Sequence, residues 1–461
     1  MNDQALCFVP LGGAGEIGMN LNVYAWRGRL MVVDCGITFS RRPGGETDIS
    51  MPDPTWLVHN RDRVDGMVLT HVHEDHIGAV TAIWPLLRCP VYATPFAAAV
   101  LRAKLQQAGL TMAVPLREIQ PGQHFHVGPF GIRMIGITHS TVESQSLVIE
   151  TDLGRVLHTG DWKLDPRPLV GPPTDVAALQ ALGRSGGVLA VISDSTNATK
   201  PGRSGSESDV RAHLMRRCAG VEQRVVAACF ASNIARIQTL FAVAEACERS
   251  PVLMGRSLHR MVGAAQACGH LPVDLPLVPA EHAGYLPRER VMFICTGTQG
   301  EPRAAMARLA TDRFRHMMLD PGDVALFSSK IIPGNEQPIA WLHGCLSDLG
   351  VEVISEEKEP QVHVSGHPCQ DELAEMYEWV QPQHVVPVHG TDRHLDAHAS
   401  LACTLGFGDV QVRNGDMLQL APGPPRVIER VRVGRVPRPD VESGRPFERR
   451  HRGGRRRAFK R

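Results

Sequence analysis

Short apolar runs that end in a polar residue recur through the first third of the chain. The segments RLMVVDCG, DGMVLTHVHEDH, IRMIGITHS and RVLHTGDW are rich in β-branched residues and too short for helices, so the pattern predicts strands. In chain order, these runs end at Asp34, at a histidine-rich cluster whose first residue is His71, at His139 and at Asp161. Because rigid scaffolds present catalytic groups on the loops that follow such elements, these positions are candidates for a functional site.

A different pattern fills the chain from about residue 200 to 355. Runs such as VVAACFASN, PVLMGRS, VMFICTGTQG and DVALFSS alternate with helical stretches such as IARIQTLFAVAEACER. Strand, small-residue loop and helix in succession predict a parallel α/β sheet. This region is therefore expected to form a unit of its own.

The overall composition is that of a globular protein. The chain has 461 residues, of which 43% are hydrophobic and 21% charged, and this excludes a disordered chain. Near the start, Pro10 and several glycines interrupt a short apolar run, so neither a secretory signal nor a membrane span is expected, and the predicted location is cytoplasmic. The eleven cysteines are scattered singly with no C-x-x-C pair, so we expect them to be reduced and mostly buried.

The net charge of +1 hides an asymmetry. Residues 426–461 contain thirteen arginines and one lysine against four acidic residues, so the rest of the chain is net negative. The closing segment RRHRGGRRRAFKR has no apolar periodicity, and residues 426–461 are therefore predicted to form a disordered basic tail. Such a tail is attracted to polyanions, nucleic acid above all; the alternative is a solubilising tail without a specific partner.

Four candidate metal ligands, His71, His73, Asp75 and His76, lie within six residues in the order H-x-H-x-D-H. Residues two apart in an extended segment point to one side, whereas Asp75 and His76 turn a corner and face a neighbouring point. One segment can therefore contribute to two metal sites. Imidazoles with a carboxylate and no thiolate suit Zn²⁺ and tolerate Mn²⁺.

Further ligands are expected on other loops that follow apolar runs. The candidates are His139 in GITHS, Asp161 in HTGDWK and His389 in VPVHG. Each alone is typical of a hydrogen-bonded surface residue, and only their conjunction with the histidine-rich segment marks them as ligands.

These motifs together resemble those of a known family. HVHEDH, His139, TGDWK and the Asp34 of VVDCG are similar to the successive motifs of the metallo-β-lactamase fold. PLGGAGEIGMN, ISDSTNAT, FASNIAR, CTGTQGEP, FSSKIIPGNE, VHVSGH and VPVHG resemble the β-CASP nuclease branch, specifically bacterial ribonuclease J, over residues 7 to about 420. The resemblance implies an α/β fold, in which an αββα metallo-β-lactamase sandwich (residues 1–200 and 356–425) carries an inserted parallel α/β β-CASP domain (residues 201–355).

The resemblance also implies ligand sets and an activity. One zinc would be held by His71, His73 and His139 and a second by Asp75, His76 and His389, with Asp161 bridging them. Asp34 would not be a ligand but would orient the ligand loop through hydrogen bonds. The implied function is zinc-dependent hydrolysis of single-stranded RNA in RNA processing and decay. Its main mode would be 5′-to-3′ exonuclease action that prefers 5′-monophosphate ends, and endonuclease action would be a second mode.

Phosphodiester hydrolysis also needs a proton for the departing 3′ oxygen. His367 of VSGH and Asp194 of SDST occupy the family's motif positions beside the metals, and Asp161 completes the implied catalytic group. An imidazole titrates near neutral pH, and a neighbouring Asp194 would raise its pKa, so His367 is the expected general acid. The alternative is a structural histidine in a glycine-containing loop.

Four residues carry donors suited to an RNA phosphate, namely Ser232, Asn233 and Arg236 in FASNIAR and Ser365 in VSGH. In ribonuclease J a pocket of this kind receives the 5′-monophosphate end. The alternative is that Ser232 and Asn233 cap the helix that follows.

The sequence departs from the family's pattern at two positions. Ala235 stands where histidine is common and Thr391 where glutamate is usual, and both are expected to weaken contacts near the site. The family usually continues through a further C-terminal domain that helps assembly, where this sequence carries the basic tail. The implied homodimer is therefore left open, and the tail is expected to serve as an RNA anchor.

Three other functions are weighed against this one. Hydrolases of thioesters or lactones share the scaffold but lack the α/β segment between Asp194 and His367. A DNA-directed β-CASP nuclease stays open, because nothing in these residues reads a 2′-hydroxyl. A catalytically inactive RNA-binding scaffold is disfavoured, because every expected ligand position is filled.

Overall fold

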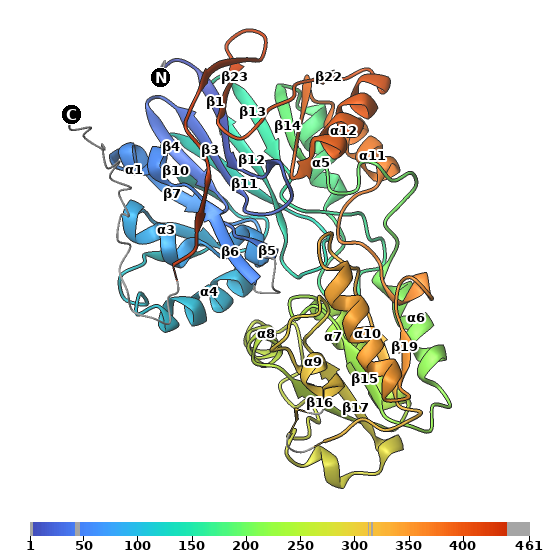
Figure 1. Ribbon diagram of the computed structural model, residues 1–461. Helices are drawn as coiled ribbons and strands as arrows, with labels where there is room; N and C mark the ends of the chain where they lie inside the picture. The colour runs from blue at the N-terminus through green and yellow to red at the C-terminus, as the bar shows by residue number, and fades with distance from the viewer. Residues whose placement is uncertain (1–2, 42–46, 312, 315–316, 440–461) are drawn as a thin grey trace, which may run out of the picture.

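Two large β-sheets stack face to face in the upper part of Figure 1, and a smaller sheet forms a separate unit below them. The computed structural model describes residues 3–41, 47–311, 313–314 and 317–439. The first large sheet has the strand order β24 (Arg426–Arg430), β23 (Asp416–Ala421), β1 (Leu6–Gly12), β3 (Leu21–Trp26), β4 (Arg29–Val33), β7 (Val64–Val68), β8 (Val91–Ala93) and β9 (Leu116–Glu118). The second has the order β10 (His124–Val127), β11 (Phe130–Gly136), β12 (Gln145–Thr151), β13 (Gly154–His158), β14 (Val188–Asp194), β20 (His384–Val388) and β22 (Gly408–Asp409).

The space between the two large sheets is filled by apolar side chains from both. Phe8 and Tyr24 of the first sheet share one buried cluster with Phe130 and Ile149 of the second. Because side chains alternate along a strand, each sheet also has an outer apolar face, and helices cover it. Those on the first sheet are α1 (Thr55–His59), α3 (Val80–Leu87) and α4 (Pro95–Gln107), and those on the second are α5 (Val176–Arg184), α11 (Gln370–Val380) and α12 (Asp392–Thr404). The predicted αββα sandwich is confirmed.

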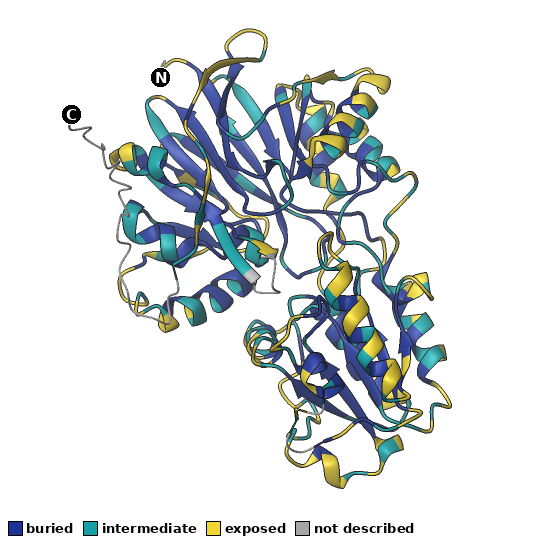
Figure 2. Ribbon diagram, in the orientation of Figure 1, coloured by how far each residue is buried: buried dark blue, intermediate teal, exposed yellow. Residues whose placement is uncertain are grey.

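The third sheet is parallel throughout, as the sequence predicts. Its order is β16 (Ser250–Met254), β17 (Val291–Cys295), β15 (Val225–Ala228), β18 (Val324–Phe327) and β19 (Glu352–Ile354). Helices α6 (Glu207–Cys218), α7 (Ile234–Ala246) and α8 (Arg256–Ala267) pack on one face, and α9 (Ala305–Ala310) and α10 (Glu336–Asp348) on the other. Figure 2 shows the strands of this unit almost wholly buried beneath partly exposed helices.

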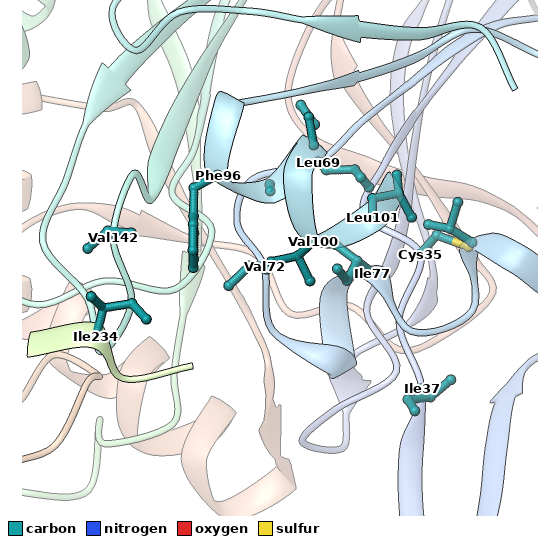
Figure 3. Close-up of a cluster of buried hydrophobic side chains, with 14 of the residues drawn as sticks. Cys35, Ile37, Leu69, Val72, Ile77, Phe96, Val100, Leu101, Val142 and Ile234 are labelled. Carbon is teal, nitrogen blue, oxygen red and sulfur yellow. The ribbon is translucent and has the colours of Figure 1, made fainter. Parts of the chain in front are cut away.

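The inserted unit lies within the chain of the sandwich. Strand β14, before the insertion, pairs in parallel with β20, which follows it, so the second large sheet closes across the insertion. The two units also share apolar contacts, since Val142 of the sandwich and Ile234 of α7 belong to the same buried cluster (Figure 3). The junction between the units is therefore held both by chain continuity and by packing.

One boundary prediction is wrong. Residues 426–439 are not a disordered tail, because β24 pairs with β23 and β25 (Arg435–Pro437) pairs with β6 (Thr47–Pro52). Val431 is buried, and Val433 and Val436 pack against the core, so apolar residues among the arginines anchor this segment. Residues 440–461, the remainder of the predicted tail, lie outside the described residues.

Two smaller expectations concern the whole chain. All eleven cysteines are free, and most are buried, as predicted. Among the described residues, no helix is long and apolar enough to cross a membrane.

Candidate metal centre

The predicted site residues lie at one edge of the sandwich, where the carboxyl ends of several strands meet. His71 and His73 follow β7, His139 follows β11, and Asp161 follows β13. Asp194 ends β14, and His389 comes directly after β20. Because β13, β14 and β20 are parallel neighbours, Asp161, Asp194 and His389 emerge side by side.

The core behind the histidine-rich segment fixes which way its side chains face. Leu69, Val72 and Ile77 point into an apolar cluster that includes Phe96 and Leu101 of α4 (Figure 3). The candidate ligands between them are turned away from this cluster, toward the strand ends of the second sheet. Burial of these three apolar side chains thus orients the candidate ligands.

A first group of donors, meaning side-chain atoms that could bind a metal ion, is formed by three imidazoles and a carboxylate. The Nδ1 atom of His73 lies 3.1 Å from Nε2 of both His71 and His139, and Asp161 Oδ2 lies 3.9 Å and 3.8 Å from those two Nε2 atoms. Burial lowers the pKa of all three histidines, that of His73 to about 4, so they are neutral near pH 7. Three neutral imidazoles whose nitrogens converge at this spacing fit a divalent cation bound at about 2.0–2.1 Å from each nitrogen.

A second group shares Asp161 with the first. Asp161 Oδ2 lies 3.2 Å from His76 Nε2, and Asp161 Oδ1 lies 3.2 Å from His389 Nδ1. Asp75 Oδ2 is 3.2 Å from His389 Nε2. Burial opposes charge on His76 and His389, but the surrounding carboxylates, with Asp161 foremost, raise the pKa of both. The seven predicted ligands thus fall into two groups that share Asp161.

The nitrogens that turn away from the centre have partners of their own. His76 Nδ1 donates to Asp34 Oδ2 at 2.7 Å, and His139 Nδ1 donates to the carbonyl oxygen of Gly366 at 2.5 Å. Thr70 donates its hydroxyl to Asp34 at 2.8 Å and lies 3.0 Å from His71 Nδ1. Such partners fix the ring orientation so that the opposite nitrogen, Nε2, faces the centre, which is the arrangement of metal-ligating histidines.

The loop of Asp34 also holds the backbone of the ligand segment. The amide of Cys35 donates to the carbonyl oxygen of His76 at 2.6 Å, and the amide of Asn20 donates to that of Asp75 at 2.9 Å. Gly36 lies so close that a Cβ atom there would overlap the carbonyl oxygen of Asp75. Sequence reasoning anticipated Asp34 but missed Asn20 and Thr70, although Thr70 directly precedes the H-x-H-x-D-H segment.

His367 and Asp194 lie beside the two donor groups. His367 Nδ1 donates to Asp194 Oδ2 at 2.7 Å, and the His367 side chain is 23% exposed. Burial opposes the charge on His367, yet Asp194 raises its pKa above the usual range, while His367 holds the pKa of Asp194 well below its usual range. The pair therefore places an accessible imidazole, whose pKa is raised by Asp194, at the edge of the cluster.

The prediction that Arg236 binds an RNA phosphate is wrong. Its guanidinium is fully buried and forms an ion pair with Glu207, with both Nε and Nη2 at 3.0 Å from the carboxylate. Nη1 donates to Ser328 and to the carbonyl oxygen of Val362. Because its guanidinium is fully buried and each of its nitrogens donates within the protein, Arg236 cannot reach a ligand, and its role is to join α6, α7 and the end of β18.

Of the other three candidates for phosphate binding, Asn233 caps a helix, whereas the two serines stay partly exposed. Asn233 is buried and caps α7, since its Oδ1 accepts from the amide of Arg236 at 2.9 Å and its Nδ2 donates to Glu207. Ser232 and Ser365 remain partly exposed. The Ser365 hydroxyl accepts from Asn197 Nδ2 at 2.7 Å, and Asn197 also donates to the carbonyl oxygen of His367 at 3.0 Å.

The two departures from the family pattern lie at helix starts. Ala235 is the second residue of α7 and is partly exposed, and Thr391, exposed, precedes α12. Thr391 Oγ1 lies 2.8 Å from His394 Nδ1.

The sandwich, its inserted parallel sheet and the double group of donors define a metal-dependent hydrolase of the metallo-β-lactamase type. Comparisons with sequence models of protein families agree with this division of the chain. The beta-lactamase superfamily domain matches residues 29–185, the ribonuclease J beta-CASP domain residues 222–343, and the Zn-dependent metallo-hydrolase RNA specificity domain residues 357–412.

Curated relatives specify the family. The chain is 43% identical to ribonuclease J of Sinorhizobium meliloti, over 94% of this chain and 78% of the relative. It is 39% identical to ribonuclease J of Mycolicibacterium smegmatis, over 92% of this chain and 76% of the relative. A solved protein of unknown function from Enterococcus faecalis V583 shares the fold at 14% identity, with a TM-score of 0.58 over 88% of this chain and 98% of the other. The chain belongs to the ribonuclease J family of metal-dependent nucleases.

Proposed function

We propose that the chain is a zinc-dependent ribonuclease that degrades single-stranded RNA from the 5′ end, with a preference for a 5′-monophosphate and with endonuclease action as a second mode. The observation that carries this proposal is the double group of donors around Asp161, with the His367–Asp194 pair beside it. The membership of the ribonuclease J family supports RNA as the substrate.

The metal ligands follow from the two donor groups. His71, His73 and His139 would hold one Zn²⁺, and Asp75, His76 and His389 a second, with Asp161 between them; Mn²⁺ also suits these donors. When bound, two such ions activate the attacking water and stabilise negative charge on the phosphate. The chain contributes rigidity here, because Asp34, Thr70 and the Gly366 carbonyl fix the rings of His76, His71 and His139.

His367 supplies the proton in this proposal. Its Nδ1–H is held by Asp194, so Nε2 carries the transferable proton, and Asp194 favours the protonated form by raising the pKa of the imidazole. As water adds its oxygen to phosphorus and the bond from phosphorus to O3′ breaks, His367 protonates the departing O3′. The products are a 5′-phosphate on one fragment and a 3′-hydroxyl on the other.

The position of Ser365 favours release of mononucleotides. Ser365 lies two residues from His367, and Asn197 donates to both residues, so the candidate phosphate site and the proton donor are fixed to each other. A terminal phosphate held at Ser365 and Ser232 would leave the first internucleotide linkage close to His367. Directional exonuclease action follows from that arrangement.

The test uses 3′-labelled single-stranded RNA with a 5′-monophosphate, 5′-triphosphate or 5′-hydroxyl end, together with matched DNA, each with and without a chelator. The expected result is chelator-sensitive release of mononucleotides that is fastest with the 5′-monophosphate. Internal cuts indifferent to the 5′ end would make the enzyme an endonuclease, and equal cleavage of DNA would make it a general nuclease. No cleavage of either polymer would contradict the proposal and favour a small-molecule hydrolase. A homodimer stays a prediction, which sedimentation of the full chain would test.

A further inference from the structure

An ion pair joins the inserted unit to the loop that carries His139. His270 follows α8, and its Nε2 atom lies 2.7 Å from Oε1 of Glu143. Because an ionised carboxylate only accepts hydrogen bonds, the imidazole donates. Both side chains are largely buried, with 17% of His270 and 10% of Glu143 exposed. The two residues belong to different units, whose helices α4 and α8 face each other across the junction (Figure 1).

Glu143 has a second partner within the sandwich. Its Oε2 accepts from the backbone amide of Phe96 at 2.8 Å, in the first turn of α4, where amides have no partner inside the helix. Burial opposes charge on Glu143, but the hydrogen bonds from His270 and from the Phe96 amide hold the pKa of its carboxyl below the usual range. The carboxylate is therefore ionised near neutral pH and connects three segments, namely its own loop, α4 and the end of α8.

The backbone of Glu143 has a conformation that residues other than glycine rarely adopt. Its φ of 57° lies in the left-handed region. A residue persists in such a conformation where its surroundings hold it, and the side chain of Glu143 has two partners that do so. The hydroxyls of the neighbouring Thr141 and Ser144 are buried and have no hydrogen-bond partner among the described residues. The conformation of the loop therefore depends on the contacts of Glu143.

The same short loop carries a candidate metal ligand. It is closed at its base, where the amide of Ile137 donates to the carbonyl oxygen of Ser144 at 3.1 Å. His139 lies in this loop four residues before Glu143, and its Nε2 is 3.1 Å from Nδ1 of His73. A shift of Glu143 would therefore move the His139 ring relative to the other donors of the first group.

Apolar packing supports the ion pair from both units. Val142 precedes Glu143 and Leu271 follows His270, and both belong to one buried cluster. The His270 ring also lies edge-on to the ring of Phe96, with 5.9 Å between the ring centroids. The position of His270 against the loop is thus fixed by packing across the junction.

We propose that Glu143 and His270 are positioning residues, through which the inserted unit holds the loop of His139 in place and sets the zinc affinity of the first donor group. The alternative is that Glu143 only caps α4, in which case His270 would have no effect on metal binding. The inference rests on the proposed role of His139 as a zinc ligand. It makes the docking of the inserted unit a part of the metal centre.

The experiment measures the zinc affinity of the chelator-treated full chain by competition with a chromophoric chelator, and then kcat and KM for RNA at saturating zinc. His270→Ala is compared with His270→Gln, whose amide N–H can replace the imidazole donor. His213→Ala is the matched control, because His213 of α6 pairs with Glu359 at 3.1 Å, just before the short helix η4 (Pro360–Val362).

His270→Ala should weaken zinc binding about tenfold, the lower end of the range for residues that support a metal ligand. His270→Gln should restore most of the affinity, and His213→Ala should match the wild type. Saturating zinc should return kcat and KM of His270→Ala to the wild-type values, because the variant keeps every ligand.

The outcomes separate this inference from the proposed function. Unchanged zinc affinity in His270→Ala would overturn the inference, and an equal loss in His213→Ala would also overturn it, because the effect would then be general. A raised KM at unchanged zinc affinity would make His270 an RNA contact instead. A wild type that binds no zinc would refute the proposed function and this inference together. A wild type that binds zinc but leaves RNA intact would refute the proposed activity alone, and the zinc affinities of the variants would still decide the inference.

Discussion

The junction between the two units has walls of opposite character. On the sandwich side, imidazoles and carboxylates converge on Asp161, and the nitrogens of His71, His76 and His139 that face away each have a partner. On the side of the inserted domain, Arg236 lies in the first turn of α7 and Lys330 in the loop after β18. The first wall carries the candidate metal ligands, and the second carries cations.

The two cations of the second wall differ in burial and in ion pairing. Arg236 is fully buried with Glu207, and each of its guanidinium nitrogens donates within the protein, whereas the Lys330 side chain is only partly buried. Residue type made Arg236 a plausible phosphate ligand, but the buried carboxylate of Glu207 makes it a structural cation.

The largest expected effect comes from removing the residue that both donor groups share. Asp161→Asn should lower bound metal and reduce turnover by about 10⁴-fold or more, because metal activation of water and charge stabilisation are lost together. Elemental analysis and RNA cleavage measure the two effects. Asp175→Asn, which alters only the cap of α5, is the control. Full metal content with normal turnover would show that Asp161 is not a ligand.

Removal of the proton donor should lower turnover without lowering metal content. His367→Ala is expected to reduce turnover by about 10²- to 10⁴-fold with unchanged metal content, the effect of losing a general acid. In the wild type, activity should fall as pH rises through the raised pKa of His367, because the imidazole then loses the proton it donates. That alkaline decline should vanish in the variant. Loss of metal instead would make His367 a ligand.

Arg236 should affect stability and leave end preference alone. Arg236→Met leaves Glu207 buried and unpaired, which is expected to destabilise the protein by about 3–5 kcal/mol. Denaturant unfolding measures the loss, and the double variant Arg236→Met with Glu207→Gln should recover part of it. A stable Arg236→Met protein that has lost its preference for 5′-monophosphate ends would restore Arg236 as a phosphate ligand.

Gly366 tests whether the position of the His139 ring determines metal affinity. A Cβ atom at this position would lie 2.8 Å from Ser140 Cβ and 2.9 Å from His139 Cε1, so Gly366→Ala should displace the His139 ring. Loss of such a supporting contact is expected to weaken metal affinity about 10- to 100-fold. A competition titration with a chromophoric chelator measures it. Gly263→Ala, in open space on α8, should leave affinity unchanged.

The smallest expected effect concerns residues 440–461, which contain eight arginines and one lysine against three acidic residues. Their deletion should weaken RNA binding modestly and flatten the plot of log affinity against log salt concentration, because fewer counterions are released. Fluorescence anisotropy at several salt concentrations measures the slope. An unchanged slope would refute the role of this segment as an RNA anchor.

Much of the fold could be predicted, because it depends on local patterns. The apolar runs that end at Asp34, His139 and Asp161 became β4, β11 and β13, and the strand-helix alternation became the parallel inserted sheet. The basic segment after residue 425 was misjudged, since its charge concealed Val431, Val433 and Val436, which reach the core. Composition reports average character, whereas a few apolar residues among the arginines are enough to anchor a segment.

The site was predicted where motifs are dense and missed where partners are distant in sequence. The pairing of His367 with Asp194 was expected, and its 2.7 Å contact is present. The ion pair of Arg236 with Glu207 joins two different helices, and no local pattern marks it. Tertiary packing decides which of several similar donors remains free.

The most direct test of the account is a zinc titration of chelator-treated protein, with bound metal and RNA turnover measured on the same samples. The two donor groups around Asp161 predict two zinc ions per chain and full turnover only when both are bound. Full turnover with a single ion per chain, or turnover of RNA that persists without metal, would contradict the account.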